Sequence, residues 1–508
     1  MPPKKKPFVF FKPPVSINKE LSLLKSKPAL YWEKKGEEMV MELFQYVYRA
    51  VPAYGKFLRS NGVDTGKVKS YKDFLQVPPV SKKNYLSRYS AQQVSLDGTL
   101  NRPLVYTSTS GSTGSPFYFH RSFELDKKTS AIHELFFLHG GYKKDEPALV
   151  VVCFGMGVWI GGLITYQAFR IMQENGYNLS IITPGINKQE IFKVLKSVAP
   201  AFKNVILVGY PPFIKDIVDQ APAEGIDWGK IKPRFIFAAE SFTENFRDYV
   251  AKKAAVRNIF LDTLNIYGTA ELGAMAFETP LCILLRRLCM ENKKLFEHIF
   301  GDIRKTPTLA QYIPSFIAFD SDNGNILVTG SNTIPLIRYQ LGDRGGVYTF
   351  KDLTKHFKEF SIDVKSEAKK AKIGAYLYQL PFVYIHERDD LSTNLYGLQI
   401  YPEPIREALL HKPICSYLTG KFVLETKFDE KQDQYFIINL ELQNGQKVTS
   451  LIKKLTLDLI VKNLKQKNSE YAELNKFLGK RSLPKLSFWA AGDTQYFKPG
   501  VKQKWVKK

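Results

Sequence analysis

The stretch Leu149–Met172 reads LVVVCFGMGVWIGGLITYQAFRIM, and the fold prediction starts from it. Its first part is apolar and β-branched, glycines interrupt the middle, and the remainder has apolar residues at helical spacing. No charged residue stands between Ala148 and Phe169, so this part also resembles a membrane span in length. The glycines and the change of period favour a buried strand, a turn and an amphipathic helix instead.

The same order of strand, turn and helix recurs three more times along the chain. Each unit is an apolar run followed by an amphipathic run, at 179–185 and 187–199, 204–210 and 211–221, and 234–241 and 242–254. Strands that alternate with helices predict a largely parallel sheet covered on both faces. Ligands of such sheets bind at the carboxyl ends of the strands, so we expect functional residues in the turns after them.

The chain on either side of this region has a different pattern. Residues 1–100 favour helices, as in the run EKKGEEMVMELFQYVYRAVPAYGKFLRSNG that stops at Gly62. After Tyr339, turn-rich runs predict antiparallel strands, and beyond Asp390 the chain is rich in lysine. That last part contains two strand-like runs and one long amphipathic run, at 421–428, 434–442 and 449–467.

The 508 residues carry a formal net charge of +24 and are 44% hydrophobic and 24% charged. The composition is ordinary for a globular protein of about two to four domains. The positive excess favours anionic ligands in general, and a basic nucleic-acid-binding or scaffolding protein is one alternative. Charge alone supports that alternative, because the sequence has no zinc finger, RNA-binding strand signature or basic heptad region. We therefore expect no specific nucleic-acid partner.

Four cysteines are scattered through the chain without a CxxC pair: Cys153, Cys282, Cys289 and Cys415. This usage indicates a reducing compartment, so we expect a cytoplasmic protein with its thiols mostly in the core. Cys282 and Cys289 are spaced to share one helix face, and core packing explains them better than zinc, whose ligands are normally closer in sequence. The apolar run at the N-terminus is too short for a signal peptide.

A second informative segment is Tyr106–Pro116, YTSTSGSTGSP. Its glycines let the backbone approach a ligand closely, and its N–H groups and hydroxyls form a set of donors that suits phosphate oxygens. The spacing is not that of a nucleotide P-loop. Taken alone, the segment fits a flexible Ser/Gly turn equally well. Its candidate phosphate-binding residues are Ser110, Gly111, Ser112, Thr113, Gly114 and Ser115.

Five further segments follow in order, and together they support the interpretation of this loop as a phosphate-binding loop. They are Ala239–Glu240, NIYGTAE at Asn265–Glu271, PLIRY at Pro335–Tyr339 with Gly342–Asp343 after it, RDD at Arg388–Asp390 before Gly397–Pro402, and YFKPGVKQKW at 496–505. Their order resembles the adenylate-forming superfamily, and within it the phenylacetate–CoA ligase-like branch. The N-terminal portion 51–86 is also similar to that branch, so the resemblance covers roughly residues 30–508.

The resemblance implies an α/β fold with a large multi-sheet N-terminal adenylation domain at 1–388 and a small mobile α+β C-terminal domain at 389–508. In this superfamily a carboxylate attacks the α-phosphate of ATP, pyrophosphate leaves, and a thiol or another nucleophile then takes the acyl group. An AMP-forming acid–CoA ligase that uses ATP, Mg²⁺ and coenzyme A is therefore implied. Asp389 falls at the hinge about which the small domain turns between the two steps.

Roles for the phosphate and ribose sites come from the same resemblance. The loop at Ser110–Ser115 would hold the β- and γ-phosphates and stabilise the leaving pyrophosphate. Glu271 would bind Mg²⁺, with capping of a following helix as the alternative. Asp343 would accept hydrogen bonds from both ribose hydroxyls, with a plain Gly-Asp turn as the alternative.

The remaining roles concern the base and the catalytic residues. Arg338 would orient this region or a phosphate, and Thr269 joins Glu271 as a candidate catalytic residue. The adenine would pack between two walls that are formed by Tyr267 with Gly268 and by Ala239 with Glu240.

A lysine near the C-terminus would bridge the α-phosphate and the carboxylate in the first step. Lys502 best matches the expected position, and Lys498 and Lys504 are its rivals. The chain departs from the family at Ser115, where relatives usually carry lysine, at His386-Glu387, where Gly-Arg is usual, and in the missing Pro-x-Thr lead-in of the tail. These departures leave adenylation in place but open the acceptor: coenzyme A, or an amine or hydroxyl of a protein or polysaccharide.

The sequence does not fix the acid. Large side chains alternate with glycines around Trp159, Tyr210 and the strand ends at Gly209 and Gly268, which predicts the acid pocket there. The oligomeric state is likewise open.

Overall fold

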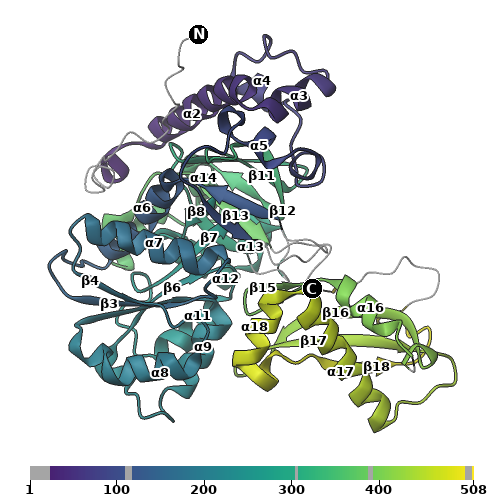
Figure 1. The fold of residues 1–508 in the computed structure, drawn as a ribbon. Helices are drawn as coiled ribbons and strands as arrows, with labels where there is room; N and C mark the ends of the chain where they lie inside the picture. Colours follow the sequence, from purple (N-terminus) through teal and green to yellow (C-terminus); the bar gives the residue numbers. More distant parts are fainter. Residues whose placement is uncertain are drawn as a thin grey trace.

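The computed structural model describes residues 23–108, 117–301, 303, 307–386, 393–412, 414–497 and 506–507. Most of the strands form one large sheet. Their bounds are β3 (Ala148–Cys153), β4 (Leu179–Ile182), β5 (Asn204–Gly209), β6 (Arg234–Ala238), β7 (Thr263–Thr269), β8 (Gly273–Phe277), β9 (Thr308–Gln311), β10 (Ile317–Asp322), β11 (Asn325–Gly330), β12 (Leu336–Tyr348) and β13 (Phe382–His386). These 11 strands follow the order β10-β11-β12-β13-β9-β8-β7-β6-β5-β3-β4 (Figure 1).

One half of this sheet is parallel, as the strand–helix rhythm predicts. Strands β4, β3, β5, β6 and β7 all run the same way, and every residue of β3 is buried. Helices cover both faces, which explains why these strands are apolar throughout rather than alternating. Figure 1 shows α6 (Phe123–His139) and α7 (Ile160–Glu174) on one face and α8 (Lys188–Ser197), α9 (Pro211–Gln220) and α11 (Glu244–Lys253) on the other.

The stretch from Leu149 to Met172 folds as expected: it forms β3, a turn and α7. Within the described ranges, none of the helices has the length and apolar character needed to cross a membrane.

The other half of the sheet is antiparallel, beginning where β7 pairs with β8. Further helices border this half, and the N-terminal ones place residues such as Phe44 and Val47 in the same apolar core as strands β10 to β12. A separate hairpin joins β1 (Val105–Ser108) to β2 (Tyr118–Arg121). The helices of this half are α2 (Ala29–Ala50), α3 (Pro52–Ser60), α4 (Tyr71–Phe74), α5 (Ala91–Val94), α12 (Pro280–Glu291), α13 (Lys293–Phe300), α14 (Phe350–Glu359) and α15 (Val364–Lys370). The short α10 (Trp228–Ile231) precedes β6 in the parallel half.

The cysteines take the places expected of core thiols. Cys282 and Cys289 both lie on α12 and are buried in one apolar cluster, and Cys153 is buried in β3. Cys415 is half-buried, and all four are free. Burial raises the pKa of the Cys282 and Cys289 thiols to about 12, so neither is a ready metal ligand.

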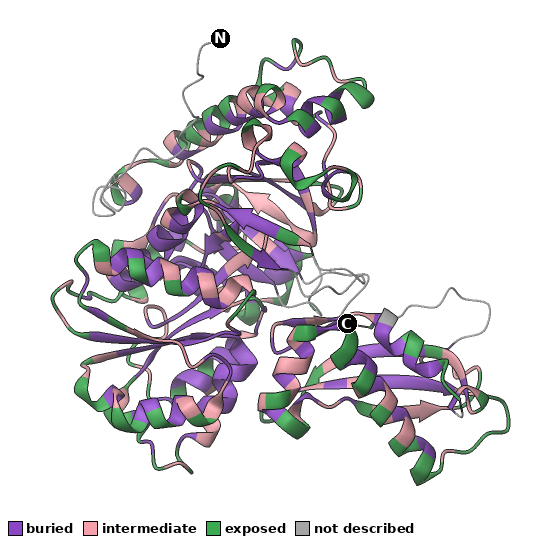
Figure 2. Ribbon diagram, viewed as in Figure 1, coloured by how far each residue is buried: buried purple, intermediate pink, exposed green. Residues whose placement is uncertain are grey.

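The C-terminal part forms a separate layered unit beside the large sheet (Figure 1). It consists of the hairpin β14 (Thr393–Leu395) and β15 (Leu398–Ile400), a sheet in the order β16-β17-β18, and helices α16 (Pro402–Leu409), α17 (Ser450–Lys467) and α18 (Ser469–Leu478). The sheet strands are β16 (Leu418–Phe428), β17 (Gln434–Leu442) and β18 (Lys485–Trp489). Its strands and helices bury their inner faces, as Figure 2 shows. The α/β fold class is thus confirmed.

A polar seam joins this C-terminal part to α9. It consists of Lys215, Asp216, Asp433 and Arg481: Arg481 contacts Asp216 at 2.6 Å and Asp433 at 2.9 Å, and Lys215 also pairs with Asp433. Burial alone would raise the pKa of Asp433, but hydrogen bonds from Arg481 and Lys215 lower it to about 2. Asp433 is therefore ionised at neutral pH and attracts both cations, whereas burial raises the pKa of Asp216.

A buried ion network fixes α11 and α12 to the sheet. Arg247 is fully buried and contacts Glu244 at 2.9 Å and Glu278 at 2.8 Å, and Arg286 contacts the same two carboxylates. Buried charges are tolerated only when they are paired in this way.

Replacement of Arg247 by leucine should lower the free energy of unfolding by about 3–5 kcal/mol, because it leaves buried carboxylate charge that is only partly compensated. Chemical denaturation measures this change. The control is Arg170→Leu, which removes an exposed arginine 4.0 Å from Glu174 and should change the free energy by about 0.5 kcal/mol or less. Equal effects of the two substitutions would contradict the structural role of the network.

Candidate active site

A cavity of about 830 Å³ lies at the carboxyl ends of β5, β6 and β7. This is where sequence reasoning expects a ligand, because the turns after parallel strands leave a crevice at the end of the sheet. The turns after β3 and β6 and the run from Asn265 to Glu271 line one side. The β14–β15 hairpin and the start of α18 line the other, so the cavity lies between the large sheet and the C-terminal part.

Two predicted adenine-site residues lie at the end of β6. Ala239 and Glu240 both line the cavity, and Ala239 has a left-handed backbone with φ +75°. The buried Glu240 carboxylate accepts a hydrogen bond from the Gly397 N–H and another, at 3.1 Å, from the Gln434 side chain. The Glu240 side chain therefore ties the C-terminal part to the edge of the cavity. Ala239 contributes only a methyl group to the cavity wall.

Tyr267 and Asp343 come together on the cavity wall from different strands. The Tyr267 hydroxyl donates a hydrogen bond to Asp343 Oδ2 at 2.6 Å. This bond connects β7 with β12, which are 76 residues apart at this point. Gly268 follows Tyr267, and an added Cβ there would lie 2.6 Å from the Gly273 carbonyl oxygen, so the close pairing of β7 with β8 requires glycine.

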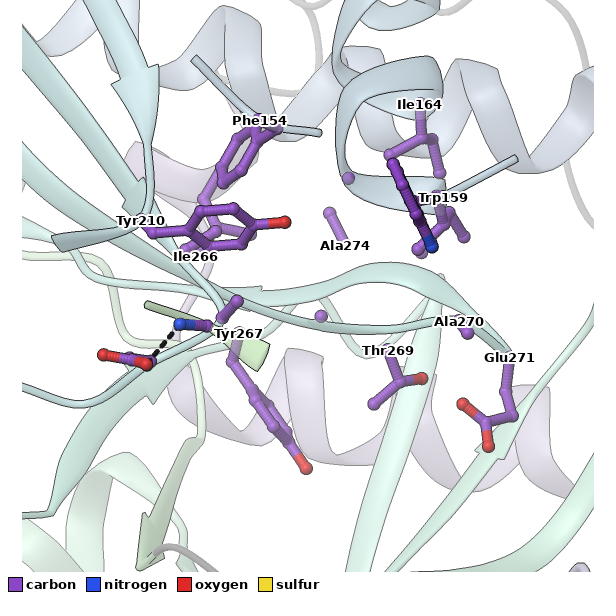
Figure 3. Close-up of a pocket in the computed structure, with 18 of the residues that line it drawn as sticks. Phe154, Trp159, Ile164, Tyr210, Ile266, Tyr267, Thr269, Ala270, Glu271 and Ala274 are labelled. Atoms are coloured by element: carbon purple, nitrogen blue, oxygen red, sulfur yellow. Dashed lines mark hydrogen bonds between the residues drawn. The ribbon is translucent and has the colours of Figure 1, made fainter. Parts of the chain in front are cut away.

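Thr269 and Glu271 lie at the opposite end of the cavity from Tyr210 (Figure 3). Glu271 Oε1 accepts a hydrogen bond of 3.2 Å from the Tyr339 hydroxyl, which aims the carboxylate. No helix follows Glu271, because β8 begins at Gly273. The helix-cap alternative is therefore wrong, and a carboxylate oriented into the cavity fits the hard oxygen ligand that Mg²⁺ prefers.

One side of the cavity is apolar and aromatic. Figure 3 shows Phe154 and Tyr210 together, with Trp159 and Ile164 further along, across from Thr269 and Glu271, and Phe154 packs edge-on against Tyr210 with ring centroids 4.8 Å apart. Trp159 and Tyr210 are the residues around which the acid pocket is predicted. One face of the cavity is thus suited to an apolar group and the other to charge.

Arg338 does not reach the cavity. Its guanidinium is buried, contacts Asp320 at 2.9 Å and donates to the Val77 carbonyl. The Val80 N–H donates to the Arg338 carbonyl, and the Gln340 N–H donates to the Val80 carbonyl. Arg338 and the backbone around it therefore hold the N-terminal section against β12. The structure brings the other described candidates, Ala239, Glu240, Tyr267, Gly268, Thr269, Glu271 and Asp343, to the cavity but leaves this one out.

Several candidates lie outside the described residues: Ser110, Gly111, Ser112, Thr113, Gly114 and Ser115 of the loop, Asp389 of the hinge, and Lys502 with its rivals Lys498 and Lys504. Ser108, the last residue of β1 before the loop, lines the cavity.

The cavity also contains residues that sequence reasoning did not single out. Lys82 and Lys83 line it from the N-terminal section, and they bring positive charge to the lining. His133 lines it from α6, where burial lowers the pKa of its ring to about 4 and keeps it neutral. The two lysines stand within the portion that resembles the family, and nothing local in the sequence distinguishes His133.

Glu470 is a further missed residue, and it enters the cavity from the C-terminal part. It stands in the first turn of α18 and is half-buried beside Tyr210, Gln399 and Tyr401. Burial raises the pKa of its carboxyl to about 7. Among the described residues, no ion pair or hydrogen bond to its side chain is found. A carboxylate with this pKa can hold or release a proton at neutral pH.

Comparison with known proteins finds relatives of low sequence identity. No family model matches the chain. Phenylacetate–coenzyme A ligase of Thermus thermophilus is 21% identical over 320 residues, which are 60% of this chain and 64% of that relative. The match thus spans less than two thirds of the curated relative's length.

Solved structures of 2-hydroxyisobutyryl-CoA ligase superimpose on nearly the whole chain. The structure with 2-HIB-AMP and CoA in the thioesterification state is 14% identical with a TM-score of 0.63, over 96% of this chain and 91% of that one. A postadenylation-state structure of the same enzyme gives a TM-score of 0.53, also at 14% identity, over 96% and 90% of the two chains. The fold is that of the adenylate-forming enzymes. The resemblance drawn from the sequence motifs, to the phenylacetate–CoA ligase-like branch of these enzymes, is confirmed.

In this adenylate-forming fold, Gly397 holds the C-terminal hairpin against the cavity wall. Gly397 has φ +80°, and a Cβ added there would lie 2.2 Å from the Tyr210 ring. Its N–H also donates to Glu240. A side chain at this position would push the hairpin away from both residues.

Gly397→Ala should therefore weaken the packing of the C-terminal part and lower the unfolding free energy by more than backbone strain alone accounts for. Gly420→Ala is the matched control, because Gly420 has φ +84° and open space around it. Denaturation of both variants separates strain, common to the two, from the clash. Equal losses of unfolding free energy in the two variants would show that the close contact between Gly397 and Tyr210 does not contribute to stability.

Proposed function

We propose that the protein is an ATP-dependent ligase that activates a carboxylic acid as an acyl adenylate and passes the acyl group to coenzyme A. The observation that carries this proposal is the meeting of Ala239, Tyr267, Glu271 and Asp343 around one cavity at the carboxyl ends of the sheet. These four residues come from three separate motifs of the adenylate-forming order, with Tyr267 and Glu271 in the same one. The likeness to coenzyme A ligases in fold and in motif order supports the same reaction here.

Each end of the cavity suits one part of the acyl adenylate. The adenine fits between Ala239 and Tyr267, and Asp343 would accept hydrogen bonds from the ribose hydroxyls. The phosphates would then point toward Thr269 and Glu271. The aromatic side that contains Phe154, Trp159 and Tyr210 supports a bulky apolar or aryl acid.

The reaction balances in two displacements. A carboxylate oxygen of the acid attacks the α-phosphorus of ATP, and pyrophosphate leaves with the electrons of the broken P–O bond. The thiol sulfur of coenzyme A then attacks the acyl carbon, loses its proton, and AMP leaves. Glu271 would hold Mg²⁺, which neutralises charge on the phosphates, and the Ser110–Ser115 loop would bind the leaving pyrophosphate.

We further propose that residues 1–388 form the adenylation domain and 389–508 the C-terminal domain, with the hinge at Asp389. The C-terminal sheet and its helices form a unit of their own, which supports this division. The four free cysteines support a reducing, cytoplasmic location.

Glu271→Ala and Asp343→Ala should each lower substrate-dependent ATP–pyrophosphate exchange at least about 100-fold, because each removes a charged contact to ATP or its metal. A panel of aryl and acyl acids supplies the substrate. Asp145→Ala is the control, since Asp145 is exposed and does not line the cavity. Exchange by either cavity variant at the wild-type rate would refute the site.

Lys502→Ala should lower the adenylation rate far more than the transfer rate, because its charge is needed while the carboxylate attacks the α-phosphate. Exchange measures the first step, and thioester formation from a preformed adenylate measures the second. Lys498→Ala and Lys504→Ala, at the two rival positions, should keep the wild-type exchange rate. An unchanged exchange rate in Lys502→Ala would exclude that lysine as the bridge.

A second candidate function differs only in the acceptor, and the sequence departures at His386-Glu387 and in the tail support it. An amine that attacks the acyl carbon must lose a proton, and a carboxylate with a pKa of about 7 beside the cavity can take it. The acceptor would then be an amine of a protein or polysaccharide, and the product an amide. The thiol of coenzyme A must also lose a proton, so Glu470 is compatible with either acceptor.

The two acceptors can be separated with a preformed adenylate. If an amine is the acceptor, the rate of amide formation should rise with pH through about 7, as Glu470 ionises. Glu470→Gln should abolish this rise and lower the rate at least about 10-fold. Glu473→Gln, one turn along α18, is the control because Glu473 does not line the cavity. Rapid thioester formation with coenzyme A and no amide from any amine would exclude the amine acceptor.

A further inference from the structure

Three side chains from two helices meet on the surface where α13 and α14 end: one from α13 and two from α14. His298 Nε2 lies 2.8 Å from His356 Nδ1, and Glu359 Oε2 lies 3.5 Å from each of these two nitrogens. Within the described part of the chain, this is the group of three or more His, Cys, Asp or Glu residues whose ligand atoms all lie within 4.8 Å of one another. None of the three lines the cavity.

The meeting of two histidines is unusual for this chain, which has only seven. His120, His133, His139 and His386 are buried, so three remain accessible: His298, His356 and His411. Two of these three face each other from helices 58 residues apart. The pair is thus a product of tertiary packing and not of a local histidine-rich run.

The separations match a set of metal ligands. Tetrahedral Zn²⁺ with bonds of about 2.0–2.2 Å places any two ligand atoms about 3.3–3.5 Å apart. Both separations that involve Glu359 agree with this value, and the two nitrogens need to part by only a few tenths of an ångström. A hydrogen bond between the rings accounts for the 2.8 Å contact, but it does not account for a carboxylate oxygen equidistant from both nitrogens.

The electrostatic setting also favours a cation. His298 lies in the last turn of α13, and His356 and Glu359 lie in the last turn of α14. The carboxyl end of a helix carries partial negative charge, so two such ends converge here, together with the charge of Glu359. The negative charge from the two helix ends and Glu359 opposes the positive charge of two neighbouring lysines on α14, Lys355 and Lys358.

Aromatic contacts hold both imidazoles. The His298 ring packs on Phe360 with centroids 5.5 Å apart, and the His356 ring meets Tyr348 edge-on at 5.6 Å. On α14, His356 and Glu359 are three residues apart and therefore share one face. The ligand set is consequently ordered by the fold before any ion binds.

We propose that His298, His356 and Glu359 bind one divalent transition-metal ion, with Zn²⁺ as the best match and water as the fourth ligand. Two imidazoles and one carboxylate suit Zn²⁺ and the neighbouring ions Co²⁺, Ni²⁺ and Cu²⁺, and they suit Mg²⁺ poorly. The ion clamps α13 to α14. This metal site is distinct from the nucleotide cavity, and the bound ion stabilises the fold.

Binding of Zn²⁺ to the full, tag-free chain, freed of metal by a chelator, tests this proposal in competition with a chromophoric chelator. The wild type should bind one Zn²⁺ per chain, and His298→Ala, His356→Ala and Glu359→Gln should each weaken that binding at least about 10-fold. His411→Ala, which alters the remaining accessible histidine, should leave it unchanged. Zn²⁺ should raise the melting temperature of the wild type and of His411→Ala but not of His298→Ala.

Co²⁺ supplies an independent readout that does not depend on the stability of any variant. The wild type should give the intense visible absorption of tetrahedral Co²⁺, and Zn²⁺ should displace it. The proposal is overturned if the wild type fails to bind Zn²⁺, if the three variants bind it as tightly as His411→Ala does, or if Co²⁺ gives only a weak octahedral spectrum.

Discussion

The pairing of β7 is the constraint on which the site depends. β7 pairs in parallel with β6 on one edge and antiparallel with β8 on the other, and the run from Asn265 to Glu271 continues through this change of direction. Gly268 makes the close pairing possible, because any side chain there would strike the Gly273 carbonyl. Tyr267 and Thr269 are thereby held within a strand along one wall of the cavity, and Glu271 lies in the short turn that joins β7 to β8.

Contacts from outside the parallel half complete that wall. Tyr267 fixes Asp343 of β12, and Tyr339 of the same strand aims Glu271. The C-terminal part closes the opposite side through Gly397, whose N–H binds Glu240, and through the polar seam at Arg481. The cavity is therefore shared by the two parts of the chain. An enzyme that exchanges one small substrate for another at the same centre can use such an arrangement, since movement of one part changes what the cavity admits.

The sequence could predict what depends on local pattern. The apolar runs and helical periods gave the parallel strands and their helices, because burial on both faces imposes a pattern that a short window reveals. The motif order gave Tyr267, Glu271 and Asp343, because each motif is contiguous. Arg338 was different: its partner Asp320 lies on another strand, and only packing decides that the guanidinium points to it and not to the cavity. Glu470 and the His298–His356 pair are also invisible to local pattern, since distant elements bring them to their places.

The central claim is that one molecule of ATP occupies the cavity between β7, β12 and the C-terminal hairpin. Determination of a crystal structure with ATP and Mg²⁺ bound tests it most directly. We predict adenine between Ala239 and Tyr267, the ribose hydroxyls within hydrogen-bonding distance of Asp343, and the metal on Glu271. Nucleotide bound elsewhere, or a cavity that stays without nucleotide at saturating ATP, would contradict the account.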